Sequence, residues 1–461
     1  MTKPDANNSE ASDLQLSNLE ATTHDKAQKS MSDGGMNKPL SKQAEQVQKS
    51  LAKRYAAERR FKAYGLASVS FGLCALLVLF IEIFGGGLGG FKQTQIALTL
   101  DLDSDVLEVY DATNPDEILA GNYTGVIRNA LKERFNDAKT RTEKRALYSM
   151  ISVGATYDLR DMLAQDPDLL DTQVDLWVLA DDDIDTYYKS LSSVPYAERM
   201  SDKQIAWVKD LIAAEQIRTV FNTRLFTSGD SSEPEMAGIR GAIMGSLLTM
   251  MVTLLLSFPV GVAAAIYLEE YAPKNRLTDF VEVNINNLAA VPSIIFGLLG
   301  LAIFINLFEM PRSIPLVGGI VLTLMTLPTI IISSRAAIKA VPPSIREAAL
   351  GIGASKMQMI LHHVLPLAMP GMLTGAIIGM AQALGETAPL LMIGMVAFIM
   401  DVPGAITDPA TVMPVQIFLW SDSPERAFVE KTSAAIMVLL LFLMFMNAMA
   451  VLLRKRLERR W

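Results

Sequence analysis

Six residues form the pattern in this chain that points most clearly to a task, and the chemistry they suit is non-covalent docking: Glu347, Ala348, Ala349, Gly353, Leu365 and Pro366. Residues 344–352 are helix-forming, and Gly353 permits a backbone turn that other residues resist. Residues 355–364 can be helical again until Pro366 ends the helix. A short helix, a turn and a second short helix would make a compact knob, so we expect this knob to fit a groove on a partner protein that drives this chain.

Catalysis by the chain itself is not expected. Its histidines are His24 and the adjacent pair His362–His363, and a structural or surface role suits that pair better than metal ligation. Gly85 and Gly90 have the spacing of a phosphate-binding loop, but Phe91–Lys92 follow in place of Lys-Ser/Thr. We therefore predict that the chain is not an enzyme, hydrolyses no ATP, and binds no metal or cofactor of its own.

Membrane helices must position the knob. Of the 461 residues, 51% are hydrophobic, and the mean hydropathy is +0.29. A bilayer crossing takes roughly 20 apolar residues. Six runs reach that length: Tyr64–Phe84, Ile239–Leu268, Ile285–Phe308, Ile314–Ser333, Gly371–Ile399 and Ser433–Leu453. We expect an all-α integral membrane protein with six spans.

Basic residues predict the orientation of these spans. Lysine and arginine precede the first run and follow the last one: Lys49, Lys53, Arg54, Arg59, Arg60, Lys62, Arg454, Lys455, Arg456, Arg459 and Arg460. Because lysine and arginine collect on the cytoplasmic side, both termini and the knob loop, residues 334–370, should be cytoplasmic. No basic groove with interleaved aromatic residues is present, so nucleic acid is not an expected partner.

The remaining segments divide the chain into four parts. Residues 1–45 are polar and nearly free of aromatic residues, which predicts a disordered tail. Residues 46–84 are read as a basic helix and the first span, residues 85–238 as an outward-facing insert, and residues 239–461 as a core of five spans.

The insert should be a small mixed domain, mainly helical. Ile96, Leu98, Leu100 and Leu102 alternate with polar residues, which is typical of a half-buried strand. Ser201 and Gln204 have the spacing of a capping box, and the segment that follows is read as helical from the recurrence of Ile205, Val208, Ile212 and Ile217.

An acidic cluster, Asp181–Asp182–Asp183 with Asp185, also lies in the insert. The glycine and the closing glutamate of a calcium-binding EF-hand are absent at the required positions. A solvated acidic helix start is the favoured interpretation, because carboxylates near a helix N-terminus complement its dipole.

The knob resembles the coupling loop of ABC importer permeases, whose pattern is Glu-Ala-Ala, three residues, Gly, nine residues, Ile, any residue, Leu-Pro. The chain departs from this pattern at His363, where the family has an aliphatic residue. Three further segments resemble phosphate permeases of the PstA type: Ala264–Tyr271, Val291–Gly297 and Gly385–Leu391. The resemblance covers residues 238–461 and extends neither to the insert nor to the tail.

This resemblance implies a type I ABC importer permease in a bacterial inner membrane, in contact with lipid. It implies a heterodimer with a related second permease, a dimer of ATPase subunits that uses ATP and Mg, and a periplasmic phosphate-binding protein. Glu347 would orient the coupling helix and Gly353 would set its bend. Alternating access would follow from rigid-body rocking.

A second set of candidate residues is assigned to the pathway or its gate: Gln382, Gly385, Glu386, Thr387 and Pro389. Glu386 is expected about halfway through the fifth span, where an ionised carboxylate costs roughly 2.5–3.5 kcal/mol. It should therefore face the pore or another helix, in a structural or gating role rather than in direct contact with the substrate. Pro389 would free a carbonyl and permit a kink. At Gln382 many relatives have arginine, a natural donor to phosphate.

Three functions remain open at this point. They are a phosphate permease, a permease for another oxyanion such as sulfate or molybdate, and a membrane sensor with an outer domain. The knob argues against the sensor, because a sensor needs an output domain rather than a coupling loop.

Overall fold

The computed structural model describes residues 42–457 except residues 112, 192–198 and 426. The chain divides into two compact units, residues 1–78 and 79–461. Helix α2, Lys42–Gly90, begins in the first unit, and its stretch Arg54–Gly90 is long and apolar enough to cross a membrane. Residues 1–41 of the predicted disordered tail, with His24, lie outside the described residues. The prediction was wrong for residues 42–45, because they already belong to α2.

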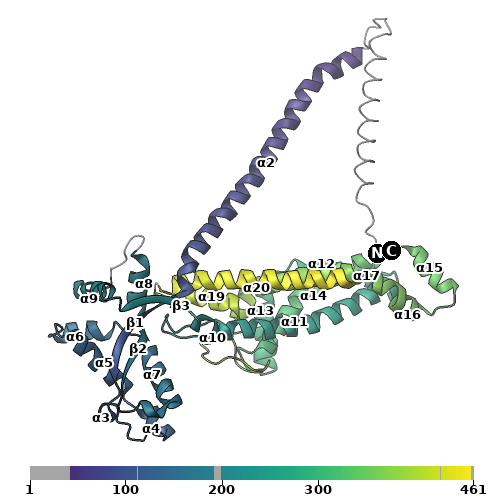
Figure 1. Cartoon of the computed structure of the whole chain (residues 1–461). Helices are drawn as coiled ribbons and strands as arrows, with labels where there is room; N and C mark the ends of the chain where they lie inside the picture. The colour runs from purple at the N-terminus through teal and green to yellow at the C-terminus, as the bar shows by residue number, and fades with distance from the viewer. Residues whose placement is uncertain (1–41, 112, 192–198, 426, 458–461) are drawn as a thin grey trace, which may run out of the picture. The chain divides into compact units, whose positions relative to one another are not determined.

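Four long apolar helices of the second unit match four of the predicted runs (Figure 1). They are α11, Arg240–Ile266, which the π-helical turn η2, Tyr267–Tyr271, extends; α14, Pro315–Lys339; α17, Leu365–Gly385; and α20, Ala427–Leu457. With α2, the described residues hold five helices that could cross a membrane.

The third predicted run is not one straight helix. Helix α12, Arg276–Ala289, is followed by α13, Ser293–Gly300, and the π-helical segment η3, Leu301–Leu307. The two parts meet at 100°, so the total of candidate spans is five, or six if the bent pair counts as one. Pro292 explains the break, because a proline disfavours helical geometry in the residue before it and has no N–H to donate.

Helix α14 is the centre of the bundle, with α11 and α17 packed against it. Its Gly319 lies directly against α11, since a Cβ there would come within 2.5 Å of Val252. Small residues allow membrane helices this close an approach and give them van der Waals contact. Helix α20 packs on α17 and on α19, Met413–Ser421.

The insert is built on a three-stranded antiparallel sheet of order β2-β1-β3. Its strands are β1, Lys92–Asp101; β2, Gln173–Leu179; and β3, Ile217–Phe221. The predicted alternation in β1 is confirmed, because Ile96, Leu98, Leu100 and Leu102 are all at most 4% exposed.

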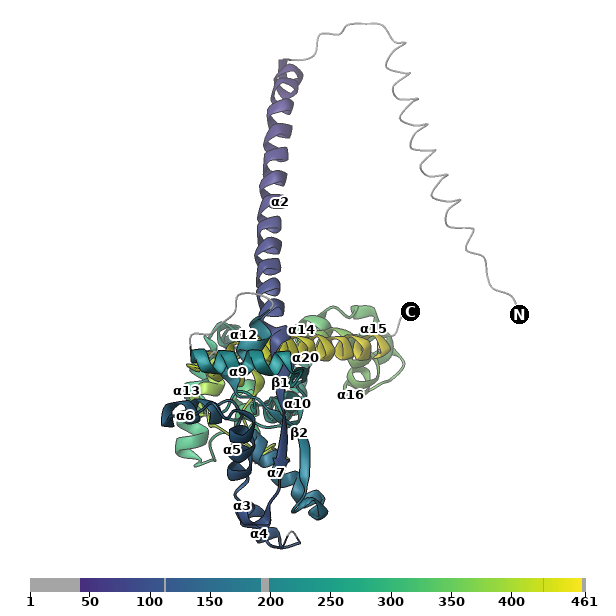
Figure 2. The ribbon, with the colours of Figure 1, turned by 60° about the vertical axis from the view of Figure 1, so that its left-hand side comes forward.

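Eight helices in the described part of the insert pack around this sheet. Figure 2 shows α5 and α7 beside it and α3 and α4 at its far end. A 3-10 turn, η1, Pro167–Leu169, follows α7. The eight helices are α3, Ser104–Leu107; α4, Pro115–Ala120; α5, Tyr123–Arg134; α6, Arg141–Tyr148; α7, Gly154–Gln165; α8, Asp182–Ser190; α9, Asp202–Ala213; and α10, Arg224–Thr227. A mixed, mainly helical domain is therefore confirmed.

The capping box of Ser201 and Gln204 is also confirmed, and it opens α9. The prediction that Ile217 continues this helix was wrong, because α9 ends at Ala213 and Ile217 pairs with Ile96 in the sheet. The spacing of apolar residues could not separate α9 from β3, because both elements place apolar side chains in the same core.

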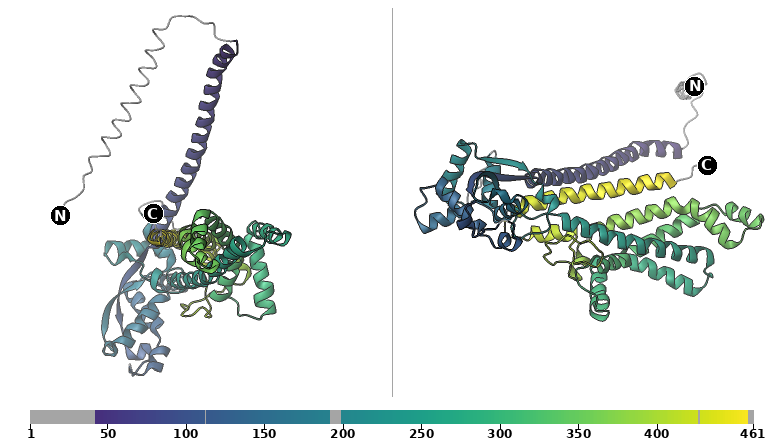
Figure 3. Two further views of the ribbon diagram at one scale, coloured as in Figure 1. Left: turned by 90° about the vertical axis from the view of Figure 1, so that its right-hand side faces the viewer. Right: turned by 60° about the horizontal axis from the view of Figure 1, so that its bottom comes forward.

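Insert and knob lie at opposite ends of the bundle of the second unit (Figure 3, right). The chain leaves the insert directly into the N-terminus of α11, and the knob packs on the C-terminal end of the same helix through Ala265 and Ile266. A helix of 27 residues spans about 40 Å at 1.5 Å per residue. The knob and the insert are thus separated by about the length of α11.

Candidate functional site

The knob consists of three short elements between α14 and α17. They are α15, Pro343–Gly351; α16, Lys356–Met359; and the π-helical turn η4, Ile360–Val364. Gly353 lies between α15 and α16 with φ of +89°, a left-handed conformation that favours glycine. The helix–turn–helix prediction is confirmed, and a capping box of Ser355 and Gln358 opens the second helix.

One expectation about the knob was wrong. Pro366 does not end the second helix, because the chain stays helical from Lys356 to Gly385. Pro366 lies in the first turn of α17, and the wider π-helical turn η4 comes directly before it. Because the chain is helical on both sides of Pro366, the proline removes one intrahelical hydrogen bond, and it does so next to the wider π-helical turn.

The predicted coupling residues divide between the surface and the interior of the knob. Glu347, Ala348 and Gly353 are exposed, Ala349 is buried at 3% exposure, and Leu365 and Pro366 are half-buried. His362 and His363 are both exposed, as predicted for a surface pair.

Apolar side chains that the sequence pattern did not single out accompany Glu347 on this surface. Leu350, Ile352, Met357 and Leu361 are 48%, 82%, 56% and 43% exposed. Exposed apolar residues grouped with a charge are typical of a protein–protein contact surface. These residues lie within eight positions of Gly353 in the sequence, and this closeness to the predicted turn is the signal that could have identified them.

Arg346 holds the knob to the bundle, and no motif in the sequence pointed to this role. Its Nε pairs with Oε1 of Glu270 at 3.0 Å. Its Nη1 and Nη2 donate to the carbonyl oxygens of Val341 and Ile338 at 2.6 and 2.8 Å. The guanidinium thereby ties η2, the C-terminal end of α14 and the knob together, and Glu347 is the next residue in the chain.

Arg335 makes a second connection at this end of the bundle. It pairs with Glu282 of α12 at 2.6 Å and with Glu269 of η2 at 3.5 Å. Arg335 thus links α12 and η2 to α14.

The pathway candidates lie at the end of a helix, which corrects the prediction that Glu386 is in the middle of the fifth span. Helix α17 ends at Gly385, and Glu386 is extended, with φ of −84° and ψ of 117°. A new helix, α18, runs from Ala388 to Met392, with Pro389 in its first turn. Pro389 therefore starts a helix instead of kinking one, because Gly385 and the extended Glu386 end α17 before it.

The residues at this break differ in their exposure. Gln382 and Gly385 are exposed, Glu386 and Thr387 are half-buried, and Pro389 is buried. Pro389 packs on α13, since a Cβ at Gly297 would lie 2.6 Å from the Cα of Pro389. The two segments that were singled out in the sequence, Val291–Gly297 and Gly385–Leu391, are thus in backbone contact.

The bundle also contains an apolar hollow of about 300 Å³ between α11, α17 and α20. Its lining includes Met250, Leu254, Ile377, Met380 and Phe442. A hollow of this lining offers no charge to an anion, so it does not qualify as an oxyanion site.

At the other end, buried polar contacts join the insert to the bundle. Lys431 of α20 is 5% exposed, and its Nζ donates to the carbonyl of Ala237 at 2.7 Å. Lys189 of α8 pairs with Glu430 at 3.3 Å. Trp420 Nε1 donates to Asp230 at 3.0 Å, and burial raises the pKa of this half-buried carboxyl while the bond to Trp420 lowers it.

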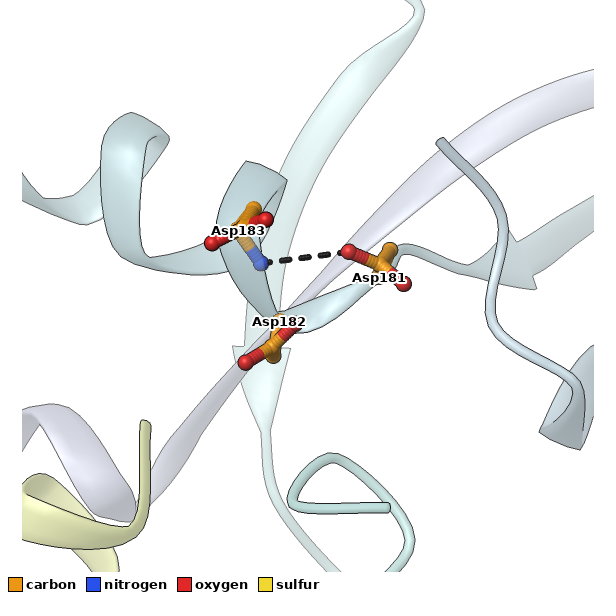
Figure 4. Close-up of side chains that lie close together, drawn as sticks. All are labelled: Asp181, Asp182 and Asp183. Carbon is orange, nitrogen blue, oxygen red and sulfur yellow. Dashed lines mark hydrogen bonds between the residues drawn. The ribbon is translucent and has the colours of Figure 1, made fainter. Parts of the chain in front are cut away.

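The three consecutive aspartates lie at the start of α8 in the insert, and Figure 4 shows them together. Their oxygens lie within 4.8 Å of one another, and Asp183 N donates to Asp181 Oδ1 at 3.3 Å. The predicted acidic helix start is confirmed, but all three side chains are half-buried instead of solvated. Burial, then Asp182 and Glu235, raise the pKa of Asp181 to about 8.

Comparisons with known proteins cover both parts of the chain. Residues 257–460 match the family described as the binding-protein-dependent transport system inner membrane component, and residues 48–197 match a domain of unknown function, DUF3333. Two separate family models thus match the transport core and a segment that includes most of α2 and much of the insert.

Curated relatives match the transport core. The phosphate transport system permease protein PstA of Yersinia pestis is 32% identical over 213 residues, which are 46% of this chain and 71% of that protein. PstA of Mycobacterium leprae is 29% identical over 51% of this chain and 78% of its own length.

A probable ABC transporter permease protein of Bacillus subtilis, YqgI, is 34% identical over 36% of this chain, and this chain spans 57% of its length. Among solved structures, an inward-facing MetNI methionine ABC transporter aligns with a TM-score of 0.41 at 18% identity, over 48% of this chain and 96% of that one.

Proposed function

Because this chain belongs to the family of binding-protein-dependent ABC importer permeases, we propose that it is the permease subunit of an ATP-driven importer of inorganic phosphate. The observation that carries this proposal is the geometry of the knob. An exposed Glu347 and exposed apolar side chains surround the Gly353 turn, and Arg346 fixes their base to the bundle. This is a rigid contact surface at the end of a membrane bundle.

The knob would bind a groove of an ATPase subunit. ATP and Mg are used there, and this chain binds no cofactor itself. Closure of an ATPase dimer would push the knob, and Arg346 would pass that motion to α14 and η2. Because helices packed as closely as α11 and α14 move as one body, the expected result is rigid-body rocking and alternating access.

Phosphate as the substrate is supported by the relatives named as phosphate permeases. The break in the helix at Gly385–Pro389 would belong to the pathway, with Gln382, Glu386 and Thr387 near it. Gln382 can donate hydrogen bonds but carries no charge, so the positive charge for an oxyanion would come from the second permease of a heterodimer. The missing charge at Gln382 weakens the link to phosphate, so a permease for another oxyanion, such as sulfate or molybdate, is the alternative.

The orientation follows from this proposal. If the knob contacts a cytoplasmic ATPase, the insert at the far end of α11 faces the periplasm, where a phosphate-binding protein would deliver the substrate. Both termini would then be cytoplasmic, in a multi-pass protein of the bacterial inner membrane.

Uptake of radiolabelled phosphate tests this function in cells that carry the chain, a second permease, the ATPase and the binding protein. We expect uptake that arsenate inhibits and that sulfate and molybdate do not. Glu347→Arg should abolish uptake and loosen ATPase binding in a pull-down, because it reverses the charge on the contact surface.

Asp279→Arg is the matched control, since Asp279 is also an exposed carboxylate but lies on α12, outside the knob. It should leave uptake intact. An assembled complex with active ATPase that transports sulfate or molybdate and not phosphate would reject the substrate, and normal uptake by Glu347→Arg would reject the role of the knob.

A further inference from the structure

The insert concentrates its positive charge in one short stretch. Over residues 85–238, Asp and Glu outnumber Lys and Arg by 27 to 15, but seven of the 15 cations lie between residues 128 and 145. They are Arg128, Lys132, Arg134, Lys139, Arg141, Lys144 and Arg145. An acidic domain that gathers its cations in this way has a local surface of opposite sign to its overall charge.

Five of these cations, all exposed, line one wide-open surface hollow formed by α5, α6 and the loop between them. They are Arg128, Lys139, Arg141, Lys144 and Arg145, and Tyr148 and Ser149 complete the lining. We use the name basic cleft for these seven residues. Figure 1 shows α6 at the edge of the insert that is remote from α20.

Two carboxylates of this stretch, Glu143 and Asp137, are engaged elsewhere. Glu143 Oε2 accepts from the backbone N–H groups of Lys139 and Thr140 at 2.9 Å, and its Oε1 pairs with Lys203 of α9 at 2.7 Å. Lys203, then the bond from Thr140, lower the pKa of Glu143 to about 2. Asp137 accepts from Trp207 Nε1 at 3.0 Å. These two acids therefore serve the cap of α6 and the contact with α9, and the five cations of the basic cleft keep an excess of positive charge.

The wall that carries these cations is firmly held. Leu147 of α6 is fully buried, and Gln204 Nε2 donates to the carbonyl of Ala146 at 2.9 Å. The ring of Tyr148 lies 5.2 Å from the Arg128 guanidinium and 5.9 Å from Lys132 Nζ. Like charges repel one another, so a scaffold fixed by these contacts, not mutual attraction, keeps the cations together.

The chemistry of the lining indicates the class of ligand. Three guanidinium groups and two ammonium groups are donors without acceptors, and arginine binds phosphate oxygens in a bidentate way. The seven residues of the basic cleft include no aliphatic side chain and a single aromatic ring, which gives little apolar area for an organic moiety. A compact, multiply charged oxyanion fits this lining best.

We propose that the basic cleft of the insert binds a phosphate-class oxyanion. The ligand would bridge cations of α5 and α6 and supply the negative charge that the cleft lacks. This site is distinct from the helix break at Gly385–Pro389, and it requires neither ATP nor transport.

The test uses the purified full chain in detergent without ATP, with isothermal titration of inorganic phosphate at low and at moderate salt. The triple variant Arg141→Gln/Lys144→Gln/Arg145→Gln should weaken phosphate binding at least tenfold. The binding of the unmodified chain should also weaken as salt rises, because charge–charge contacts are screened.

A matched control removes three cations of the insert that lie outside the cleft: Arg160→Gln/Lys209→Gln/Arg218→Gln. It should bind phosphate like the unmodified chain, and the thermal midpoints of both triple variants should confirm that they fold. Nanodiscs with phosphatidylglycerol form a second arm, and saturation of the cleft by these lipids would identify a lipid headgroup as the natural source of the phosphate group.

Equal phosphate binding by the two triple variants would overturn the proposal. So would binding of polyglutamate that depends on the cleft when phosphate does not bind, since that result would assign the surface to an acidic protein. The binding measurement does not depend on transport, so it tests the cleft even if the chain takes up no phosphate. Conversely, intact phosphate uptake by the cleft variant would support the transport proposal whatever the cleft binds.

Discussion

At the residue scale, the exposed surface of the knob depends on Arg346, a side chain that is itself half-buried. Arg346 forms three contacts with η2 and the C-terminal end of α14, and Glu347 follows it. A planar guanidinium can serve one carboxylate and two carbonyls at once. The position of Glu347 in space is thus set by its neighbour, and not by its own contacts.

Arg346→Lys should reduce phosphate uptake about tenfold, while the protein still inserts in the membrane. A lysine can keep the charge next to Glu270 but cannot reach both carbonyls, and the lost charge-assisted bond corresponds to roughly 1.5 kcal/mol. The measurement is uptake per inserted protein, with Arg276→Lys on the exposed start of α12 as control. An unchanged uptake rate for Arg346→Lys would show that the hydrogen bonds of the Arg346 guanidinium do not position the knob.

Asp181 should make the folded insert less stable as the pH rises. Its folded pKa is about 8 against 3.8 in an exposed chain, so between these values the unfolded state releases a proton that the folded state keeps. Stability from this group is therefore complete below about pH 4 and is lost as the pH rises toward 8.

Asp181→Asn keeps the cap of α8 and should remove this part of the slope, which thermal unfolding of the full chain at pH 5 and pH 8 would measure as a few °C. Asp103→Asn, at the N-cap of α3, is the control. If Asp181→Asn retained the whole slope, the titration would belong to other groups, of which Glu235 is the first to examine, since burial raises its pKa as well.

At the scale of the elements, breaks in helices bring together the segments that we propose for the pathway. The third membrane run bends by 100°, and α17 stops at Gly385. Both breaks lie next to a proline, and they allow α13 and α18 to pack backbone to backbone at Gly297 and Pro389. Two straight helices with β-carbons at this contact could not approach so closely.

Gly297→Val should destabilise the bundle by about 1–3 kcal/mol, the usual cost of overpacking, and should lower transport. A Cβ there would lie 2.6 Å from the Cα of Pro389 and 2.8 Å from its carbonyl oxygen. Thermal unfolding in detergent and uptake are the readouts. Gly72→Ala, on α2 with no atom within 4 Å of the added Cβ, should change neither one, and a stable, active Gly297→Val protein would contradict the contact.

At the scale of the whole molecule, the two ends of the bundle in the second unit hold their attached parts by different kinds of contact. The knob joins the bundle through an apolar core with Ile338, Val341 and Ile360. The insert joins it through buried polar contacts of Lys431, Glu430 and Trp420. Buried polar contacts are directional, so they fix the orientation of the insert more strictly than apolar packing alone would.

Trp420→Phe should weaken this junction by about 1–3 kcal/mol, because it leaves the Asp230 carboxylate without its indole donor in a half-buried place. Asp230→Asn should cost less, since the amide oxygen can still accept from Trp420. Limited proteolysis of the segment between residues 228 and 239 would report the loosening. Equal protease resistance of both variants and the unmodified chain would show that this bond does not hold the junction.

The sequence by itself determined the local features of this protein. Hydrophobic length gave the membrane runs, the period of two gave β1, and Gly353 gave the turn of the knob, because each of these depends on a few neighbouring residues. Tertiary structure decided the rest. The sequence could not show that α17 ends before Glu386, that Ile217 pairs with Ile96, or which groups Arg346 and Lys431 contact. The contacts of Arg346 and Lys431 alone reach partners 5 to 194 residues away in the chain, whose distance in space only the folded chain sets.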